Sequence, residues 1–341
     1  MKSETILQVI YNICSRLIRP NKVLFASNFK DDKYQNLSLL YKNALEHNLR
    51  AEFLAPKSKG FWESIGTIIA FARAKVIIVD CSHWIISKII LSHRTKIIYV
   101  GHGGGCYKKM GFALSPTNNS SALKRKKLYG QFSRVLSTSE YFDEKICLNY
   151  GVTDKDLLKI GLPRTDLLFN NPLLSRSPAR KIILFAPSFK IVNGVRQLTI
   201  NIDQLAQLTE KLGWEVWYSK HPDVPLLSQY PNSWHCCDED SYVTKMLTPS
   251  LLITDRSSIM FDFSITRKPI IVFDDQSDEK LWIKKSELEG VNCCNSFSDL
   301  HNFLSGKSPL KGSSALFEQQ MNRCDGKSCD KFSIFLKELI L

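Results

Sequence analysis

The chain has 341 residues, of which 44% are hydrophobic and 23% are charged, so it is long enough for two folded domains and too apolar to be disordered. Its formal net charge of +13 favours anionic partners: phosphorylated substrates, nucleic acid or an acidic membrane surface. The ten cysteines include no C-x-x-C pair, which excludes zinc-finger spacing and favours reduced thiols in a cytoplasmic protein.

Residues 1–20 predict an amphipathic helix that is neither a signal peptide nor a membrane span. Polar residues interrupt its apolar stretch, and the sequence has no apolar run of about 18 residues. One face of the helix carries the apolar side chains of Ile6, Val9, Ile10, Ile13 and Leu17. The basic end at Arg16, Arg19 and Lys22 favours a helix that lies on an anionic membrane. Packing of the apolar face on the helix's own domain is the alternative.

Beyond this helix, short apolar runs alternate with helix-length segments. The β-like runs are residues 23–26, 76–79, 97–100, 182–185, 216–218, 251–253 and 270–273, and the helix-length segments include 31–45, 62–73, 139–149 and 202–212. This alternation predicts an α/β fold of two Rossmann-like domains, each with a parallel sheet covered by helices. The polar, proline-containing stretch 170–179 separates the two series, so we expect domains at 21–171 and 172–341.

Polar clusters directly follow four of the apolar runs. Ligands of open parallel sheets bind beyond the carboxyl ends of the strands, so these clusters predict a cleft between the two domains. The clusters are Gly101-His102-Gly103-Gly104-Gly105, Ala186-Pro187-Ser188, Ser219-Lys220-His221-Pro222 and Thr254-Asp255-Arg256-Ser257-Ser258.

The last cluster begins a predicted amphipathic helix. Ser257 or Ser258 stands where an N-cap belongs, so free backbone N–H groups and the positive end of the helix dipole face the turn. Arg256 adds a positive charge, and these features together predict a phosphate site. An ordinary capped helix with a surface arginine is the alternative. Asp262, further along the helix, is expected to be a buried partner of Arg256 or Lys220.

The glycines around His102 indicate that a ligand approaches bare backbone there, and a histidine in a simple turn is the alternative. Their spacing is not G-x-G-x-x-G, so a dinucleotide-binding loop is not predicted. Lys220 and His221 taken alone would fit an exposed turn. A metal site made of His235, Cys236 and Cys237 is an alternative that we do not favour.

The order of these motifs resembles the CDP-glycerol glycerophosphotransferase family, the teichoic-acid primases and polymerases that transfer polyol phosphates. The resemblance runs from about Lys22 to the end of the sequence. The matching segments are His102-Gly103, Lys108-Lys109-Met110-Gly111, Gly161-Leu162-Pro163-Arg164-Thr165-Asp166, residues 184–188, Lys220-His221-Pro222, residues 254–263 and Asp325-Gly326.

The resemblance implies a glycosyltransferase-B-type fold with an N-terminal acceptor-side domain and a C-terminal CDP-donor domain. It also implies a CDP-polyol donor, first of all CDP-glycerol, and an acceptor hydroxyl on a lipid-linked molecule or a cell-surface polymer such as teichoic acid or capsule. The expected location is the cytoplasm, peripheral at the inner face of the bacterial membrane. The family usually has tyrosine where Arg256 stands, and tryptophan where Gly101 stands.

The expected reaction is attack by the acceptor hydroxyl on the β-phosphate of the donor, which releases CMP. We expect His102 to be the base, with His221 as a second catalytic group and Asp255 orienting a histidine or binding a donor hydroxyl. The expected donor and phosphate ligands are Gly103, Gly104, Pro187, Ser188, Lys220, Arg256, Ser257 and Ser258. We expect neither a cofactor nor a required metal.

Two other classes of protein remain as alternatives. A nucleotide-sugar glycosyltransferase or epimerase of the same architecture would present a similar phosphate site. A non-catalytic binder of nucleic acid would interleave aromatic residues with its basic ones, and the basic run 124–127 lacks that pattern. We therefore expect no nucleic-acid partner.

Overall fold

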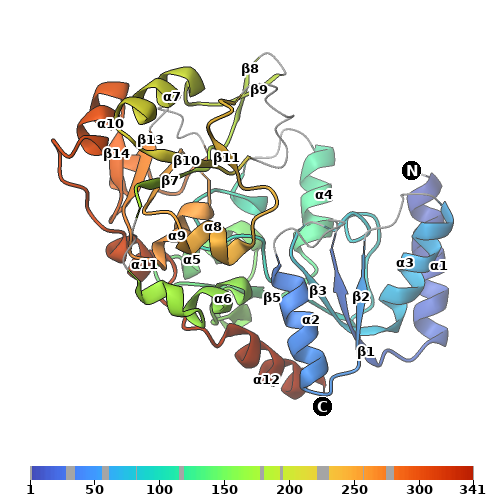
Figure 1. The fold of residues 1–341 in the computed structure, drawn as a ribbon. Coiled ribbons are helices and arrows are strands. Elements are labelled where there is room, and N and C mark those ends of the chain that lie inside the picture. The colour runs from blue at the N-terminus through green and yellow to red at the C-terminus, as the bar shows by residue number, and fades with distance from the viewer. Residues whose placement is uncertain are drawn as a thin grey trace. The chain divides into compact units, whose positions relative to one another are not determined.

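The computed structural model describes residues 2–27, 35–55, 61–81, 83–114, 119–176, 180–192, 195–220, 230–255, 257–273 and 280–340. The chain forms two compact units (Figure 1). The first unit contains Met1–Asp166 and Arg323–Leu341, and the second contains Leu167–Asn322.

The first unit is built on a six-stranded parallel sheet with the order β2-β1-β3-β4-β5-β6. Its strands are β1 Lys22–Ala26, β2 Ala51–Leu54, β3 Ala74–Val79, β4 Lys96–Tyr99, β5 Phe132–Leu136 and β6 Leu157–Leu158. Its helices are α1 Lys2–Leu17, α2 Asn36–Glu46, α3 Phe61–Arg73, α4 Asn119–Tyr129, α5 Asp143–Tyr150 and α12 Ser328–Ile340, with short 3-10 turns at Gly111–Ala113, Asp154–Asp156 and Pro163–Thr165. Figure 1 shows α2 on one side of this sheet and α1 with α3 on the other, so its central strands are apolar and buried on both faces.

The second unit repeats this plan with a parallel sheet of order β11-β10-β7-β12-β13-β14. Its strands are β7 Ile182–Phe185, β10 Glu215–Tyr218, β11 His235–Cys236, β12 Leu251–Thr254, β13 Ile270–Phe273 and β14 Asn292–Cys294, and an antiparallel pair is formed by β8 Lys190–Val192 and β9 Val195–Gln197. Its helices are α6 Asp166–Phe169, α7 Ile202–Lys211, α8 Tyr242–Leu247, α9 Ile259–Ser264, α10 Phe297–Leu304 and α11 Ser314–Gln320, with 3-10 turns at Pro172–Ser175 and Lys285–Glu287.

The predicted fold class, two parallel-sheet α/β domains, is confirmed. All seven predicted apolar runs fall on strands, because a strand covered on both faces is a continuous apolar segment. The strands β2, β5, β6, β11 and β14 were not predicted. The stretch 31–45 is helical from Asn36, and residues 28–34 lie outside the described residues.

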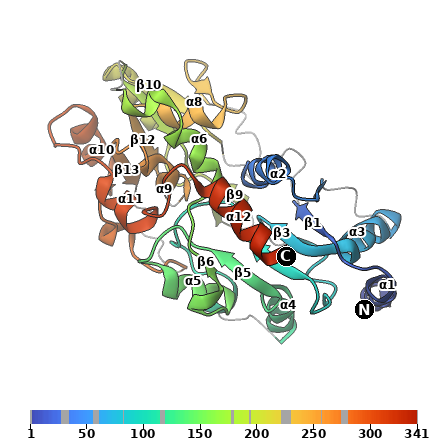
Figure 2. The ribbon, with the colours of Figure 1, turned by 90° about the horizontal axis from the view of Figure 1, so that it is seen from below.

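Helix α12 returns to the first unit and packs on α2, as both views show (Figures 1 and 2). Asn43 of α2 donates to Asp330 of α12 over 2.9 Å and accepts from Ser333 over 2.5 Å. The carboxylate of Asp166 accepts hydrogen bonds from the backbone N–H groups of Ser328 and Cys329, at 3.0 and 2.8 Å. These bonds satisfy free donors at the start of α12. The expected domain at 172–341 therefore differs from the compact unit, which ends at residue 322.

Helix α1 packs against α3 through a face different from the one singled out in the sequence. Leu7 and Tyr11 are buried, and the Tyr11 hydroxyl accepts a hydrogen bond from the backbone N–H of Ser92 over 2.9 Å. Of the five apolar side chains predicted to share one face, Ile6 (49%), Val9 (51%), Ile13 (53%) and Leu17 (80%) are exposed, and Ile10 is half-buried. Among the described residues, no helix is long and apolar enough to cross a membrane.

Candidate functional site

The glycine-rich loop 101–105 leaves the carboxyl end of β4, an inner strand of the first sheet. Gly101 and Gly105 have φ values of +69° and +66°, a region that residues with a Cβ rarely adopt. These two positions let the chain turn tightly on either side of His102, whose side chain is exposed. Gly103 is half-buried and Gly104 is buried in the same loop.

Three contacts fix the backbone of this loop from elements distant in the sequence. Asn36, the first residue of α2, donates from Nδ2 to the carbonyl of Gly101 over 3.2 Å. Arg164 donates from Nη1 to the carbonyl of His102 over 2.8 Å. On the far side, the N–H of Gly105 donates to the Thr138 hydroxyl over 3.1 Å. The loop is therefore held by its backbone, and the imidazole of His102 projects from a fixed support.

Arg164 contacts the His102 loop in a way that sequence reasoning missed. It belongs to the quoted motif 161–166, but its spacing gave no indication that its guanidinium holds the His102 loop. Its own N–H donates to the Asn36 side chain over 3.0 Å, and the residue is only 8% exposed. Gly161 begins this motif because a Cβ there would lie 2.5 Å from the Ser328 hydroxyl and 2.7 Å from the Cα of Cys324.

A partly buried ion pair lies next to Thr138, the residue that contacts Gly105. Arg323 donates to both carboxylate oxygens of Asp143 at 2.7 Å, and also to the Ser137 hydroxyl. Burial raises the pKa of Asp143, but the hydrogen bonds from Arg323 and Ser137 outweigh it, so the pKa lies below its ordinary value. The N–H of Arg323 also donates to the carbonyl of Thr138 over 3.1 Å. The returning C-terminal segment thus supports the residue that holds Gly105.

In the second unit, the predicted groups follow β10, β7 and β12, which are consecutive strands of the sheet. Asp255 is fully buried just after β12. Its carboxylate accepts from the N–H and hydroxyl of Ser188, at 2.8 and 2.9 Å, and from the Thr199 hydroxyl at 2.6 Å. Thr254 donates to the carbonyl of Ala186 over 2.7 Å. The structure therefore shows Asp255 joining the turn after β7 to the turn after β12, and buried Pro187 lies in the first of these turns.

Helix α9 begins at Ile259, and Ser258 occupies one of the two predicted N-cap positions but makes no capping hydrogen bond with its side chain. The hydroxyl of Ser257 contacts the N–H of Ile259 at 3.5 Å, the outer limit of a hydrogen bond. The helix has six residues and is almost entirely buried, so the prediction of an amphipathic segment is wrong. The misleading signal was Asp262, which looks like a solvent-facing residue but is buried and accepts from the Tyr242 hydroxyl over 2.9 Å.

Lys220 lies just beyond β10 and forms an ion pair with Asp238. The hydrogen bond to Asp238 raises the pKa of Lys220 above its ordinary value. Arg256 or Lys220 was the expected partner of Asp262. Lys220 pairs with Asp238, whose position in the β11–α8 loop gave no sequence signal, and the pairing with Arg256 is not tested by the described residues. His221 and Arg256 lie outside the described residues.

The structure also groups potential metal ligands in a way that differs from the alternative considered in the sequence. In the part of the chain that the structure describes, His235, Cys237 and Asp240 bring ligand atoms together. Cys236 is not part of the group.

Comparisons with known proteins agree with this architecture. The family model described as CDP-Glycerol:Poly(glycerophosphate) glycerophosphotransferase matches residues 8–280. A teichoic acid poly(ribitol-phosphate) polymerase from Bacillus spizizenii is 24% identical over 79% of this chain and 47% of its own length, so the chain spans about half of that relative. A teichoic acid glycerol-phosphate primase from Bacillus subtilis is 29% identical over 81% of this chain and 77% of its own length.

Solved structures show the same fold. The wall teichoic acid polymerase TagF superposes with a TM-score of 0.75 at 19% identity and covers 99% of this chain and 93% of its own. UDP-GlcNAc 2-epimerase from Neisseria meningitidis gives a TM-score of 0.57 at 12% identity and covers 93% of this chain and 100% of its own. The two-domain fold is therefore of the expected glycosyltransferase-B type. Because the family model matches most of the sequence, the chain belongs to the CDP-glycerol:poly(glycerophosphate) glycerophosphotransferase family.

Proposed function

We propose that this protein transfers a polyol phosphate, first of all glycerol phosphate, from a CDP-polyol to a hydroxyl of a lipid-linked or polymeric acceptor. The observation that carries the proposal is the family match over residues 8–280. The relatives are primases and polymerases of glycerol-phosphate and ribitol-phosphate teichoic acids. In addition, a histidine-to-asparagine variant of the TagF polymerase has been soaked with CDPG.

The role proposed for His102 follows from how its loop is built. An alcohol is a poor nucleophile at neutral pH, so the acceptor needs a base, and an imidazole titrates near the working pH. As the acceptor oxygen bonds to the β-phosphorus, its proton passes to His102. The bond from that phosphorus to the bridging oxygen breaks, and CMP leaves with the electron pair. An exposed ring on a backbone anchored by Arg164 and Asn36 suits this task, because the base must reach substrate without moving its support.

The second unit is proposed to bind the donor. Lys220 carries a positive charge, and Ser188, Ser257 and Ser258 offer hydroxyl and backbone groups at the carboxyl ends of adjacent strands. Phosphoryl transfer is largely a matter of positioning and charge stabilisation, which these groups can provide. His221 and Arg256 are proposed to add positive charge to the same site. Asp255 is proposed to act by holding Ser188 in place, given the hydrogen bonds that it accepts.

A donor screen tests the proposal. The full chain is incubated with CDP-glycerol, CDP-ribitol or UDP-GlcNAc and a lipid-linked acceptor, and the released nucleotide is identified. We expect CMP from a CDP-polyol only. Release of UDP from UDP-GlcNAc would instead support the nucleotide-sugar glycosyltransferase alternative and would overturn the proposal.

We also propose that the enzyme works at an anionic membrane surface through α1. Ile6, Val9 and Ile13 remain exposed although the opposite face of the helix is packed on α3. Exposed apolar side chains beside the basic residues Arg16 and Arg19 are typical of a helix that lies in the membrane interface. The helix is buried through Leu7 and Tyr11 instead, so the face predicted to bind the membrane or to pack on the domain still exposes Ile6, Val9 and Ile13.

Liposome binding tests this role without unfolding the helix. Replacing Ile6, Val9 and Ile13 together by glutamine should weaken binding to anionic vesicles and spare turnover on a soluble acceptor. The matched control is Ile334→Gln, because Ile334 is equally exposed at 53% but lies on α12. Binding of the wild type should also weaken as salt rises, because surface charge is screened within a Debye length. Unchanged vesicle binding by the triple variant would refute the role of α1.

A further inference from the structure

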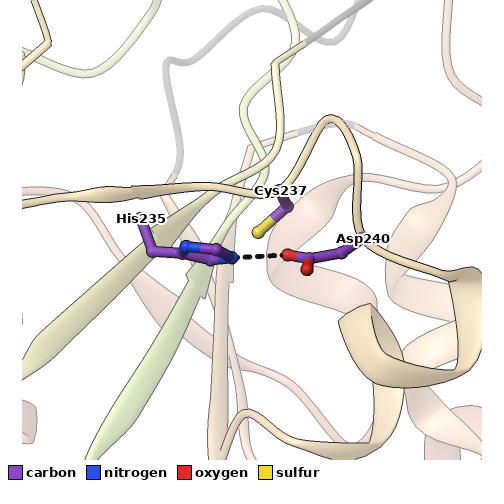
Figure 3. A group of neighbouring side chains, drawn as sticks. All are labelled: His235, Cys237 and Asp240. Carbon is purple, nitrogen blue, oxygen red and sulfur yellow. Dashed lines mark hydrogen bonds and ion pairs between the residues drawn. The ribbon is translucent and has the colours of Figure 1, made fainter.

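A compact group of metal-ligand types lies at the edge of the second sheet, in the loop that joins β11 to α8. The Nε2 atom of His235 is 2.6 Å from Oδ2 of Asp240. One ligand atom from each of His235, Cys237 and Asp240 lies within 4.8 Å of the other two. Figure 3 shows the imidazole, the sulfur and the carboxylate pointing toward one another.

The backbone brings these side chains together. Successive residues of a strand point to opposite faces, so His235 and Cys237 share one face and Cys236 points to the other. The N–H of Cys237 donates to the carbonyl of Tyr218 over 2.9 Å, which continues the pairing of β11 with β10. The N–H of Asp240 then donates to the carbonyl of Cys237 over 3.2 Å and closes a tight turn. This turn places the carboxylate of Asp240 beside the sulfur of Cys237.

The imidazole is also held in place from its other side. The ring of Trp217 lies against that of His235, with their centroids 4.8 Å apart. The indole N–H of Trp217 donates to Glu215 over 2.7 Å, so the indole ring is itself anchored. Such support restricts the orientation of a histidine ligand, as outer contacts do in metal sites.

We propose that His235, Cys237 and Asp240 bind a single Zn²⁺ ion, with water as the fourth ligand. A thiolate, an imidazole and a carboxylate are a ligand set that zinc accepts, and zinc sites with three protein ligands keep one open position. Zinc bonds of about 2.0 to 2.3 Å place tetrahedral ligand atoms about 3.3 to 3.7 Å apart. The separations in the metal-free group, from 2.6 Å between His235 Nε2 and Asp240 Oδ2 up to at most 4.8 Å, bracket that spacing. Cys237 is buried and His235 is exposed, which gives the ion a path from solvent.

Binding requires an exchange of a proton for the metal. Burial raises the pKa of the Cys237 thiol to about 12, so the sulfur carries a proton in the metal-free protein. As the zinc–sulfur bond forms, the S–H bond breaks and the proton passes to solvent. The hydrogen bond between Nε2 of His235 and Oδ2 of Asp240 is exchanged for two bonds to the metal, and the proton between these atoms passes to solvent or to Nδ1 of His235.

The proposed ion would take no part in the reaction and would instead fix the position of neighbouring side chains. Asp238, the partner of Lys220, lies inside the turn between Cys237 and Asp240. Fixing both ends of that turn would fix Asp238, and with it the ammonium group of Lys220. This consequence rests on the proposed function, which assigns Lys220 to the donor phosphates, whereas the metal site itself does not.

Metal binding by the full chain tests the proposal without any substrate. The protein is loaded with Zn²⁺ or Co²⁺ and freed of excess metal by gel filtration, and the metal content and Tm are then measured. We expect one ion per chain and a raised Tm, with thiolate-to-cobalt charge-transfer absorption in the Co²⁺ form. His235→Gln, Cys237→Ser and Asp240→Asn should each weaken binding at least about tenfold. Cys236→Ser is the matched control and should bind as the wild type does.

The comparison of metal binding by Cys236→Ser and Cys237→Ser decides whether the proposed site exists. Failure of the wild type to retain metal, or equal loss in Cys236→Ser and Cys237→Ser, would overturn the site. His235→Gln changes an exposed side chain, so it keeps the test valid if Cys237→Ser does not fold; unchanged binding by this variant would also overturn the site. Absence of CMP release would count against the proposed function and leave the metal result standing.

Discussion

At the scale of single residues, two hydrogen bonds hold the His102 loop by its backbone and not by the imidazole. Arg164 and Asn36 hold carbonyl groups of the loop, and a substitution at position 102 leaves both carbonyls in place. The exposed imidazole adds little packing. Chemistry and stability can therefore be perturbed independently at this loop.

His102→Ala should abolish transfer and leave the protein folded. Loss of a general base should lower kcat by about 100- to 10,000-fold, whereas an exposed substitution should change the free energy of unfolding by less than about 0.5 kcal/mol. CMP release and denaturant unfolding measure the two effects. Turnover close to that of the wild type in a folded variant would remove His102 from the role of base.

Arg164→Ala should lower kcat, because the loop that carries His102 loses the hydrogen bond from Arg164 and is held less firmly. The loss of a charge-assisted hydrogen bond from a buried side chain should also cost about 1.5–3 kcal/mol of stability. Because the imidazole itself is retained, the pH dependence of the remaining activity should keep its midpoint. The control is Arg134→Ala, because Arg134 of β5 is paired with Asp156 and has no hydrogen bond to residues 101–105 among the described contacts. A shifted midpoint in Arg164→Ala would indicate that Arg164 itself acts on the reacting groups.

At the scale of elements, adjacent parallel strands place their turns side by side, and buried polar contacts fix those turns. Asp255 is the clearest case, because it connects the ends of β7 and β12. Asp255→Asn should reduce stability by about 1.5–3 kcal/mol, since charge-assisted hydrogen bonds from Ser188 and Thr199 are weakened. Donor affinity should fall with it. Denaturant unfolding and CMP binding test this, and a stable variant with lost activity would favour a direct catalytic role instead.

Sequence patterns predicted the elements with continuous apolar segments and missed the short or half-polar ones. β11 has two residues, and β2 is half-buried along its length, so neither shows a clear period. The polar motifs predicted to form the site do lie directly after the strands β4, β7, β10 and β12. Arg164 and Asp238 were missed because their roles depend on partners elsewhere: Arg164 meets a carbonyl 62 residues away, and only the folded chain reveals that contact.

At the scale of the whole molecule, the ion pair between Arg323 and Asp143 attaches the returning C-terminal segment to the first unit. A carboxyl with a lowered folded pKa contributes stability above its unfolded pKa, about 3.9, and loses it as pH falls through the folded value. Asp143→Asn should therefore be destabilised at neutral pH. Its difference from the wild type should shrink below about pH 4. Unfolding midpoints measured from pH 3 to pH 8 test this, and a difference that stays constant over this range would contradict it.

The return of α12 to the first unit also sets an order of assembly during synthesis. Residues 167–322 leave the ribosome before residues 323–340, so the second unit can complete its sheet while the first still lacks a helix. Until then, α2 lacks its contacts with α12, the helix in which Phe332 and Leu336 are buried. Domains usually fold in order from the N-terminus. Here the unit that carries His102 is the last to be finished, so a nascent chain can complete residues 167–322 before the proposed base is fully supported.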